Sequence, residues 1–281
     1  MTNVVITGYA RSPFTPARRG ELAKVRPDEI AAQVVAALVA KTGVRVEDIE
    51  DLILGCAFPE GEQGLNMARM VGFLADLPQS VAGTTVNRFC GSSMQSVHMA
   101  AGAIQMGAGE AFICAGVESM TRVPMTGFNP MPHPGLFQRL PQAYVAMGMT
   151  AENLARQHDI SRDEQERLAL SSQAKAAAAQ GDGRLTEEII AITDGNDCIE
   201  VDGCPRPDTT AEDLAGLDPS FDKDGTVTAG TSSPLTDGAA AVLVTSEDYA
   251  DANGLDKLAR IKAIAVAGCA PEILGIGPVP A

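Results

Sequence analysis

Short apolar runs of strand length alternate with longer segments of helical spacing through the first part of the chain. In residues 27–41 the apolar positions recur at helical intervals, with Pro27 at the start and Gly43 just past the end. Strand-like runs occupy residues 3–9 (NVVITGY), 51–56 (DLILGC), 83–87 and 111–116 (AFICAG). Strands that alternate with helices are joined by crossovers, which favour parallel pairing. The pattern therefore predicts an α/β fold with a mainly parallel sheet and helices on both faces.

The pattern changes in residues 120–230. Proline, glycine and methionine are frequent in the first part of this segment, and two helices are predicted after it, at residues 151–158 and 162–180. The second helix follows a capping box, in which Ser161 precedes Glu164 by three positions. The segment has the character of a long loop and helical insertion. Insertions of this kind in α/β folds usually cover a binding site.

Sheet character returns after the insertion. Apolar runs at residues 239–246 and 258–269 predict two more strands. We therefore expect residues 1–119 and 231–270 to form one α/β domain that is interrupted by residues 120–230.

Composition and charge narrow the function classes. The 281 residues are 45% hydrophobic and 20% charged, which is typical of a globular protein. The formal net charge of -15 argues against a nucleic-acid-binding protein, because such proteins concentrate lysine and arginine to neutralise phosphates. No apolar run reaches the ~18 residues of a membrane span, and the N-terminus does not read as a signal peptide. We expect a cytoplasmic protein that binds neither nucleic acid nor membrane.

Cys90 stands apart from the other five cysteines. No C-x-x-C pair suggests a zinc or dithiol redox site, but Cys90 lies between a predicted strand and a predicted helix over residues 92–106. The amide N–H groups and the dipole of a helix N-terminus favour a thiolate and can hold a developing oxyanion. A buried structural cysteine is an equally good interpretation, since cysteine is among the most buried residue types. From the residues alone, both interpretations stay open.

A nucleophilic cysteine needs a base, and the chain has three histidines. His98 follows Cys90 on the same predicted helix, roughly 12 Å further along its axis, which is too far for a proton transfer. His133 lies in a proline-rich loop and His158 ends a predicted helix. The sequence therefore shows a candidate nucleophile without an evident activating group.

The region around Cys90, VNRFCGSSMQSVHMAAGAIQMGAGEAFICAGVESMTRVPM, resembles the nucleophile region of the thiolases, the acetyl-CoA acyltransferases. Further stretches are similar to the same family and occur in the same order. They are TGYARSPF, MGMTAENLARQ, SRDEQERLALSSQAKAAAAQ and DGTVTAGTSSPLTDGAAAVLV. The resemblance covers the whole chain and implies a thiolase-like layered fold, with a mainly parallel, mixed sheet, helices on both faces and a loop and helical insertion.

The resemblance also implies site residues. Cys90 matches the nucleophile that acyl-CoA acylates, and residues 120–230 match the loop domain that holds the coenzyme A moiety. Within that segment Arg206 matches a basic residue near the adenine and phosphate end, while Met147 matches a position that lines the acyl and pantetheine tunnel. Ser233 matches a residue that contacts the pantetheine arm. A solvated loop arginine, a core methionine and a turn serine are the alternative interpretations of the last three.

The implied activity is acyl transfer between acyl-CoA thioesters through an acyl-cysteine, in thiolysis of 3-oxoacyl-CoA or Claisen condensation of acetyl-CoA. No metal or separate cofactor is implied, since coenzyme A is part of the substrate. The resemblance further implies a role in fatty-acid metabolism and β-oxidation, and a homo-oligomer, either a dimer or a tetramer.

The family's second half supplies an Asn-Glu-Ala motif, a Gly-His-Pro histidine and a second cysteine in a Cys-x-Gly motif. We expect residues 271–281 to be the start of that half and the three motifs to be missing here, so that these 281 residues alone have little activity. A non-catalytic acyl-CoA-binding module and a condensing enzyme of fatty-acid or polyketide synthesis are the alternatives. The long coenzyme-covering insertion favours a thiolase over the condensing enzymes.

Overall fold

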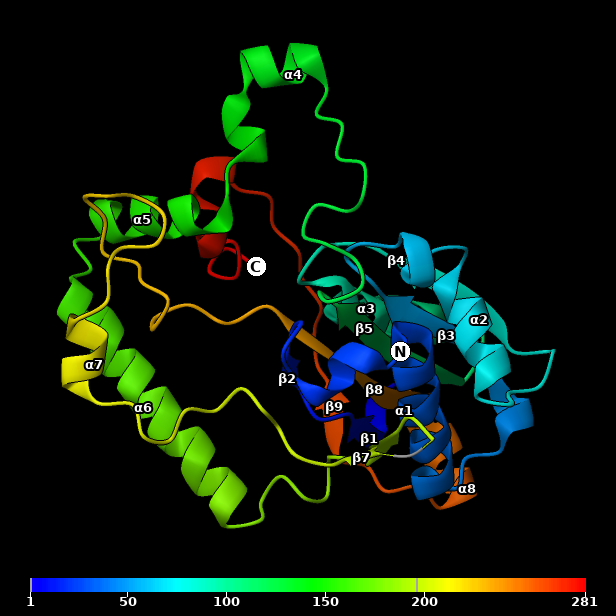
Figure 1. The fold of residues 1–281 in the computed structure, drawn as a ribbon. Helices are drawn as coiled ribbons and strands as arrows, with labels where there is room; N and C mark the ends of the chain where they lie inside the picture. Colours follow the sequence, from blue (N-terminus) through cyan, green and yellow to red (C-terminus); the bar gives the residue numbers. More distant parts are fainter. Residues whose placement is uncertain (1, 196) are drawn as a thin grey trace. The chain divides into compact units, whose positions relative to one another are not determined.

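A computed structural model describes residues 2–195 and 197–281 (Figure 1). Contacts along the chain divide it into two compact units. The first, which we call the sheet unit, consists of Met1–Asn129, Leu185–Cys204 and Leu235–Ile264. The second, the helical unit, consists of Pro130–Arg184, Pro205–Pro234 and Ala265–Ala281. The expected boundaries of a coenzyme-binding domain at residues 120 and 230 stay a prediction.

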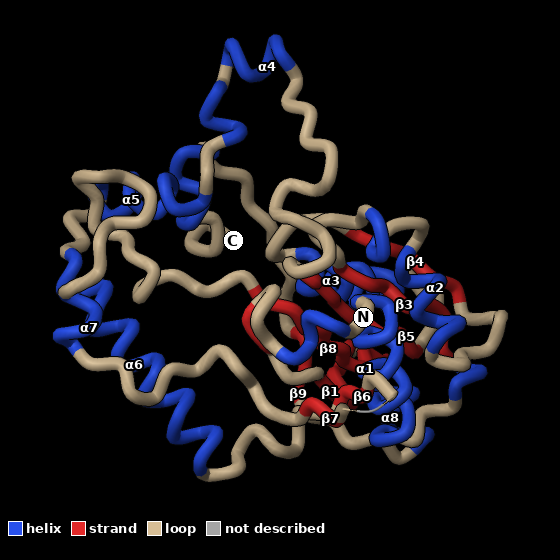
Figure 2. Tube along the Cα trace, viewed as in Figure 1, coloured by secondary structure: helices blue, strands red, loops and turns tan. Residues whose placement is uncertain are grey.

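The sheet unit is built on a seven-stranded mixed sheet, drawn in red in Figure 2. Its order is β4 (Ala82–Val86), β3 (Ile49–Gly55), β5 (Ala111–Ser119), β8 (Thr236–Ser246), β1 (Val4–Arg11) and β9 (Ala259–Ile261), with β2 (Thr15–Pro16) paired to β8. Strand β3 is parallel to both β4 and β5, whereas β8 is antiparallel to β5 and β1. The predicted α/β class is confirmed.

Helices cover both faces of this sheet, as Figure 1 shows. Helices α1 (Pro27–Thr42) and α2 (Met67–Leu74) pack on one face, and α3 (Ser92–Gln105) packs on the other. Alternate residues of a strand point to opposite faces. Accordingly Leu52 and Leu54 belong to the core under α1 and α2, while Ile53 belongs to the core under α3.

Local signals explain where α1 begins and ends. Pro27 occupies the first turn, where its missing N–H is not needed, and Gly43 ends the helix in the left-handed conformation with φ 66°. The remaining short elements of this unit are α8 (Glu247–Asn253), β6 (Ile192–Thr193), β7 (Cys198–Ile199) and the 3-10 turns η1 (Glu21–Lys24), η2 (Val46–Asp48) and η3 (Gly61–Gln63).

The predicted strand over residues 258–269 is shorter than expected. It pairs with β1 only at Ala259–Ile261, where Val4 lies opposite Ile261. Because β1 itself begins at Val4, the residues after Ile261 have no strand beside them, and they are irregular and exposed. An apolar run therefore forms a strand only as far as a partner extends.

The helical unit contains the two predicted helices and several shorter ones. The capping box forms as expected at α6 (Arg162–Gly181), where the Ser161 side chain accepts from the Glu164 N–H and the Glu164 side chain accepts from the Ser161 N–H. The other helices are α4 (Pro134–Arg139), α5 (Met147–Gln157), α7 (Ala211–Ala215) and the 3-10 turns η4 (Pro141–Tyr144) and η5 (Pro271–Ile276). Over the described ranges we find no helix with both the length and the apolarity that a bilayer crossing requires.

Candidate active site

The site begins at the carboxyl ends of β3 and β4, where the parallel strand β5 continues for three more residues. The carboxyl ends of parallel strands meet at one edge of a sheet, and the N-terminus of α3 packs directly onto this edge. A Cβ atom on Gly55 would lie within 3.0 Å of the backbone of Ser92 and Ser93. A Cβ atom on Gly116 would likewise collide with the Ser93 side chain. Glycine at these two paired positions therefore allows the helix to approach the sheet.

The turn between β4 and α3 is sharp and locally bonded. Phe89 has φ 45°, a left-handed conformation that is unfavourable for a residue with a side chain. Its N–H donates to Asn87 Oδ1 at 2.8 Å, and its carbonyl accepts from the Ser92 N–H at 2.9 Å. The Arg88 N–H donates to Ser92 Oγ at 2.8 Å. Together these hydrogen bonds hold the turn in one conformation, and Cys90 follows directly after Phe89.

Cys90 is exposed, and its side chain stands one residue before the N-cap of α3. The N-cap residue, Gly91, provides no side-chain hydrogen bond, and its own N–H and that of Ser92 donate to the carbonyls of Arg88 and Phe89. The next amides of the first turn, those of Ser93 and Met94, are therefore the ones available to a ligand or a developing charge. The exposure does not fit the alternative interpretation of a buried structural cysteine. The geometry suits a nucleophilic thiol whose tetrahedral intermediate would lie beside backbone N–H groups.

Cys56 and Cys114 are buried in the core of the sheet unit. Burial raises the pKa of the Cys56 thiol to about 12 and that of the Cys114 thiol to about 12, so both are neutral thiols at ordinary pH. Cys114, Ala115 and Gly116 do spell one Cys-x-Gly triplet, contrary to our expectation that none would occur. Because its thiol lies buried within β5, this triplet cannot serve as an accessible second cysteine.

The other three cysteines are more accessible. Cys198 and Cys269 are exposed and Cys204 is half-buried. A hydrogen bond to Glu200 raises the pKa of the Cys198 thiol, which disfavours its thiolate. Within the described residues no cysteine forms a disulfide, and no group of histidine, cysteine and carboxylate side chains could hold a metal ion.

A carboxylate that the sequence analysis did not single out lies beneath the turn. Glu118, near the end of β5, accepts hydrogen bonds from the Ala57 N–H at 2.7 Å and from Gln63 Nε2 at 2.7 Å. Gln63 is fully buried, and its Oε1 accepts from the Ser119 N–H at 2.7 Å. The only sequence signal was a glutamate that interrupts an apolar strand at the carboxyl edge of the sheet.

No histidine is seen to act on Cys90. His98 is half-buried on α3, two turns beyond the thiol. The ring of His133 is occupied as the N-cap of α4, where its Nδ1 accepts from the Leu136 N–H at 3.2 Å. His158 is the C-cap of α5. The turn itself therefore offers no histidine that could act as the base for Cys90.

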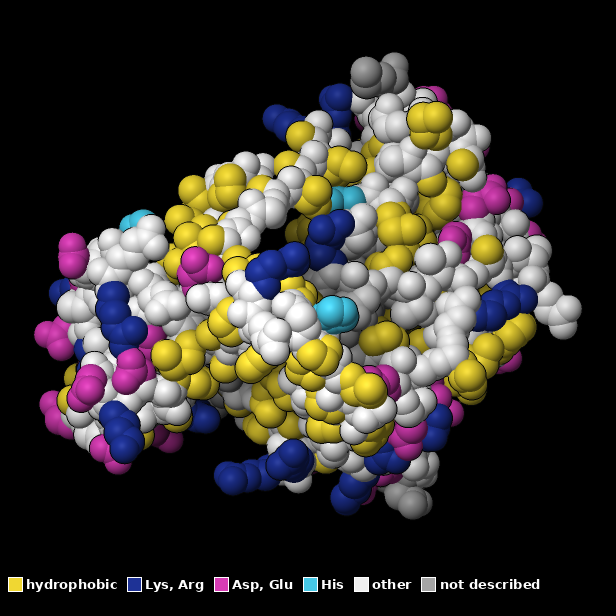
Figure 3. All heavy atoms as spheres, turned by 90° about the horizontal axis from the view of Figure 1, so that it is seen from above, with side chains coloured by type: hydrophobic (Ala, Val, Ile, Leu, Met, Phe, Trp, Pro, Cys, Tyr) yellow, Lys and Arg dark blue, Asp and Glu magenta, His cyan; other side chains and the backbone are white. Residues whose placement is uncertain are grey.

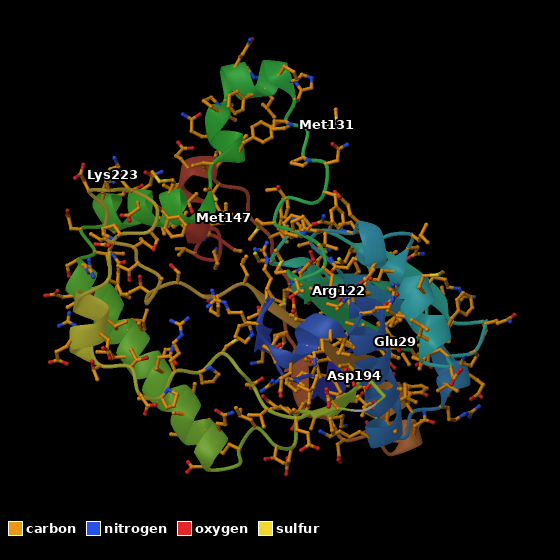
Figure 4. The ribbon with its side chains drawn as sticks, in the orientation of Figure 1. Glu29, Arg122, Met131, Met147, Asp194 and Lys223 are labelled. Carbon is orange, nitrogen blue, oxygen red and sulfur yellow. The ribbon has the colours of Figure 1, made fainter. Side chains whose placement is uncertain are left out.

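The three residues predicted to contact coenzyme A all lie in the helical unit. Met147 is the first residue of α5 and is 54% exposed (Figure 4). Arg206 is exposed, and its backbone N–H donates to Gln173 Oε1 at 2.7 Å. Ser233 is exposed in the segment that leads to β8. No recorded hydrogen bond joins any two of these side chains, so their assignment to a common site is a prediction.

Comparison with known proteins identifies the family. Residues 4–248 match the model described as "Thiolase, N-terminal domain". The 3-ketoacyl-CoA thiolase of Bacillus subtilis (strain 168) is 43% identical over 294 residues, which cover 100% of this chain and 75% of that protein. The 3-ketoacyl-CoA thiolase of Pseudoalteromonas translucida (strain TAC 125) is 46% identical over 288 residues, covering 100% of this chain and 74% of that protein.

Solved structures of related enzymes support the same family. Human mitochondrial 3-ketoacyl-CoA thiolase in complex with CoA matches with a TM-score of 0.88 and 35% identity, over 100% of this chain and 74% of that one. The Bacillus anthracis acetyl-CoA acetyltransferase matches with a TM-score of 0.89 and 38% identity, with the same coverage of 100% and 74%. The layered fold and the matching sequences thus define a thiolase-type acyltransferase. The chain belongs to the thiolase family, as its sequence motifs predicted.

Proposed function

We propose that this chain transfers acyl groups between acyl-CoA thioesters through an acyl thioester on Cys90. The reaction is the thiolysis of a 3-oxoacyl-CoA or the Claisen condensation of acetyl-CoA, in fatty-acid metabolism such as β-oxidation. The observation that carries the proposal is the exposed Cys90 thiol at the tight turn from β4 into α3, in a chain of the thiolase family. Both relatives named above are called 3-ketoacyl-CoA thiolases, which favours the first direction.

The first step follows from the geometry of the turn. The Cys90 thiolate attacks a carbonyl carbon of the substrate, and the carbonyl oxygen gains negative charge close to the N-terminus of α3. In condensation the attacked carbon is that of the thioester, the bond to the coenzyme sulfur breaks, and coenzyme A leaves as its thiolate. In thiolysis the attacked carbon is the 3-oxo carbon, the bond between C2 and C3 breaks, and acetyl-CoA leaves as its enolate, which takes up a proton. In the second step the enolate of another acetyl-CoA (condensation) or a coenzyme A thiolate (thiolysis) attacks the acyl-cysteine and regenerates the Cys90 thiolate. Dividing the reaction in this way gives ping-pong kinetics.

We propose that residues 120–230 hold coenzyme A, with Arg206 near its phosphates and Met147 and Ser233 along the pantetheine arm. A guanidinium suits a phosphate, an exposed methionine suits an alkyl chain, and a serine hydroxyl suits an amide. The similar human structure contains CoA, which supports a coenzyme site in this fold. Coenzyme A is consumed or released as a substrate, and the proposal requires no other cofactor.

These 281 residues contain neither an Asn-Glu-Ala nor a Gly-His-Pro motif, and their one Cys-x-Gly triplet is buried. Loss of a general base typically slows a reaction by about 10²–10⁴-fold. On acetyl-CoA we therefore expect this polypeptide to form an acyl-enzyme slowly and to turn over very little. Intact mass would rise by one acetyl group per chain while free coenzyme A is released in equal amount. Turnover at a rate typical of enzymes, about 10 s⁻¹, would contradict the incomplete set of catalytic groups.

The absence of a base near Cys90 in the described residues favours one alternative, a non-catalytic acyl-CoA-binding module. The same experiment separates the two functions. Binding of acetyl-CoA measured by calorimetry without any mass increase would select the module, whereas a mass increase selects the acyltransferase.

We propose further that the protein is a homo-oligomer and acts in the cytoplasm. Met94 and Met99 of α3 and Met106, its C-cap residue, are exposed, and among the described strands β4 is an edge strand that pairs with β3. Hydrophobic side chains also reach the surface on the face shown in Figure 3. Exposed apolar surface and open strand edges favour association, and a working thiol suits a reducing compartment.

Light scattering of the 281-residue chain is expected to give a mass of at least twice the 29.2 kDa of one chain. The exposed side chains of Met94 and Met99, together with the open edge of β4, supply the driving force for association. The double variant Met94→Gln, Met99→Gln should shift the distribution toward monomer. A monomer that persists at high concentration in the unchanged chain would contradict the proposal.

A further inference from the structure

Glu118 is surrounded by hydrogen-bond donors. Besides the Ala57 N–H and Gln63 Nε2, the Phe58 N–H donates to Oε1 at 3.3 Å, and the neutral Cys56 thiol lies 3.8 Å from the same oxygen. Among the ion pairs of the described residues, none includes Glu118. The carboxylate is thus held by neutral donors alone, and it fixes the Ala57–Phe58 peptide at the end of β3.

This peptide is linked to the turn that presents Cys90. The Ala57 carbonyl accepts from Asn87 Nδ2 at 2.8 Å, and Asn87 Oδ1 accepts from the Phe89 N–H at 2.8 Å. The rings of Phe58 and Phe89 also lie 6.0 Å apart, centroid to centroid, at an angle of 57°. Two separate routes therefore connect Glu118 to Phe89, one through Asn87 and one through the aromatic pair.

Phe89 is the residue that needs such support. A phenylalanine stays in the left-handed region only when its surroundings hold it there, and the residue that follows is Cys90. If the Asn87 bond is lost, the peptide before Cys90 can relax to an ordinary conformation. The position of the Cys90 thiol at the start of α3 would then no longer be fixed.

We propose that Glu118 is a positioning residue for the reaction at Cys90, acting through the Ala57–Phe58 peptide and Asn87 to hold the left-handed turn at Phe89. The inference rests on the proposed function, because it assigns Glu118 a part in presenting the acylated thiol. A carboxylate suits the place, since every neighbour donates a hydrogen bond. An amide would direct an N–H at one of those donors and leave a buried group unsatisfied.

The test uses the 281-residue chain and measures alkylation by iodoacetamide at each cysteine, resolved by peptide mass. Cys198 and Cys269, both exposed, report the general reactivity of the sample, and buried Cys114 reports unfolding. The variants are Glu118→Gln, Asn87→Ala and the two combined. Asp48→Asn is the matched control, because Asp48 accepts from Tyr249 Oη at 2.8 Å near the start of β3, at the opposite end of that strand.

Glu118→Gln and Asn87→Ala are each expected to slow alkylation of Cys90 by about tenfold, because the turn no longer holds the thiol in place at the start of α3. Arg88 is the charged side chain on the turn and is unchanged in all variants. The double variant should be no slower than Glu118→Gln alone, since the Asn87 link is part of the support that Glu118→Gln already removes. Cys198, Cys269 and Cys114 should react as in the unchanged chain, and Asp48→Asn should leave Cys90 unaffected.

Unchanged alkylation of Cys90 in either single variant would overturn the inference. If Glu118→Gln exposes Cys114, the chain has unfolded, and Asn87→Ala, a substitution at an exposed residue, decides alone. A different result would contradict the proposed function, namely that acetyl-CoA does not acylate the unchanged chain. The two failures are therefore distinguishable.

Discussion

Replacing Cys90 by serine is expected to abolish acyl-enzyme formation from acetyl-CoA. Serine keeps the size of the side chain but exchanges a thiol for a hydroxyl that is not ionised at neutral pH, and no base lies at the turn to activate it. Loss of an essential nucleophile lowers the rate by on the order of 10³-fold or more. The release of coenzyme A, followed with a thiol reagent in a chain of otherwise native sequence, measures the loss.

The matched control is Cys198→Ser, at another exposed cysteine of the sheet unit. This variant should form the acyl-enzyme at the original rate. Acylation that survives in Cys90→Ser but disappears in Cys198→Ser would place the nucleophile elsewhere.

Gly55→Ala is expected to have the largest effect among single-methyl changes. The added Cβ would lie within 3.0 Å of the backbone at Ser92 and Ser93, and backbone cannot rotate away as a side chain can. Overpacking of this kind typically costs about 1–3 kcal/mol. We expect the free energy of unfolding in urea to fall by about 2–3 kcal/mol. Because the helix N-terminus must shift, alkylation of Cys90 should slow as well.

Gly102→Ala provides the comparison within α3 itself. A Cβ at Gly102 would meet nothing within 4 Å, and alanine in a helix interior is favoured over glycine by roughly 0.5–1 kcal/mol. This variant should be at least as stable as the original chain and equally reactive at Cys90. If Gly55→Ala behaved in the same way as Gly102→Ala, the close packing of α3 against β3 would play no part in the site.

The parts of the structure that depend on adjacent residues were predictable. The start of α1 at Pro27, its end before Gly43 and the capping box at Ser161 follow from neighbours within four positions, and all three were confirmed. The turn at Cys90 was predictable for the same reason, since β4 and α3 are contiguous in the chain. The side-chain roles proposed for Arg206, Met147 and Ser233 came from family resemblance and stay predictions.

Long-range pairing was not predictable. The order of the sheet places β8, which follows the long insertion, between β5 and β1, and this makes the sheet mixed. The support beneath the turn joins Ala57 to Glu118 over 61 positions and Asn87 to Ala57 over 30 positions. No periodic pattern of apolar residues records such contacts, because they depend on which strands become neighbours.

The central claim is that the thiol at the junction of β4 and α3 is the group that carries the acyl chain. The most direct measurement is a short incubation with isotopically labelled acetyl-CoA, quenched in acid to preserve the thioester and followed by peptide mapping. We expect the label on the peptide that contains Cys90 and no label on those that contain Cys198 or Cys269. Label on another residue, or a labelled Cys90 peptide that equally appears with Cys90→Ser, would contradict the account.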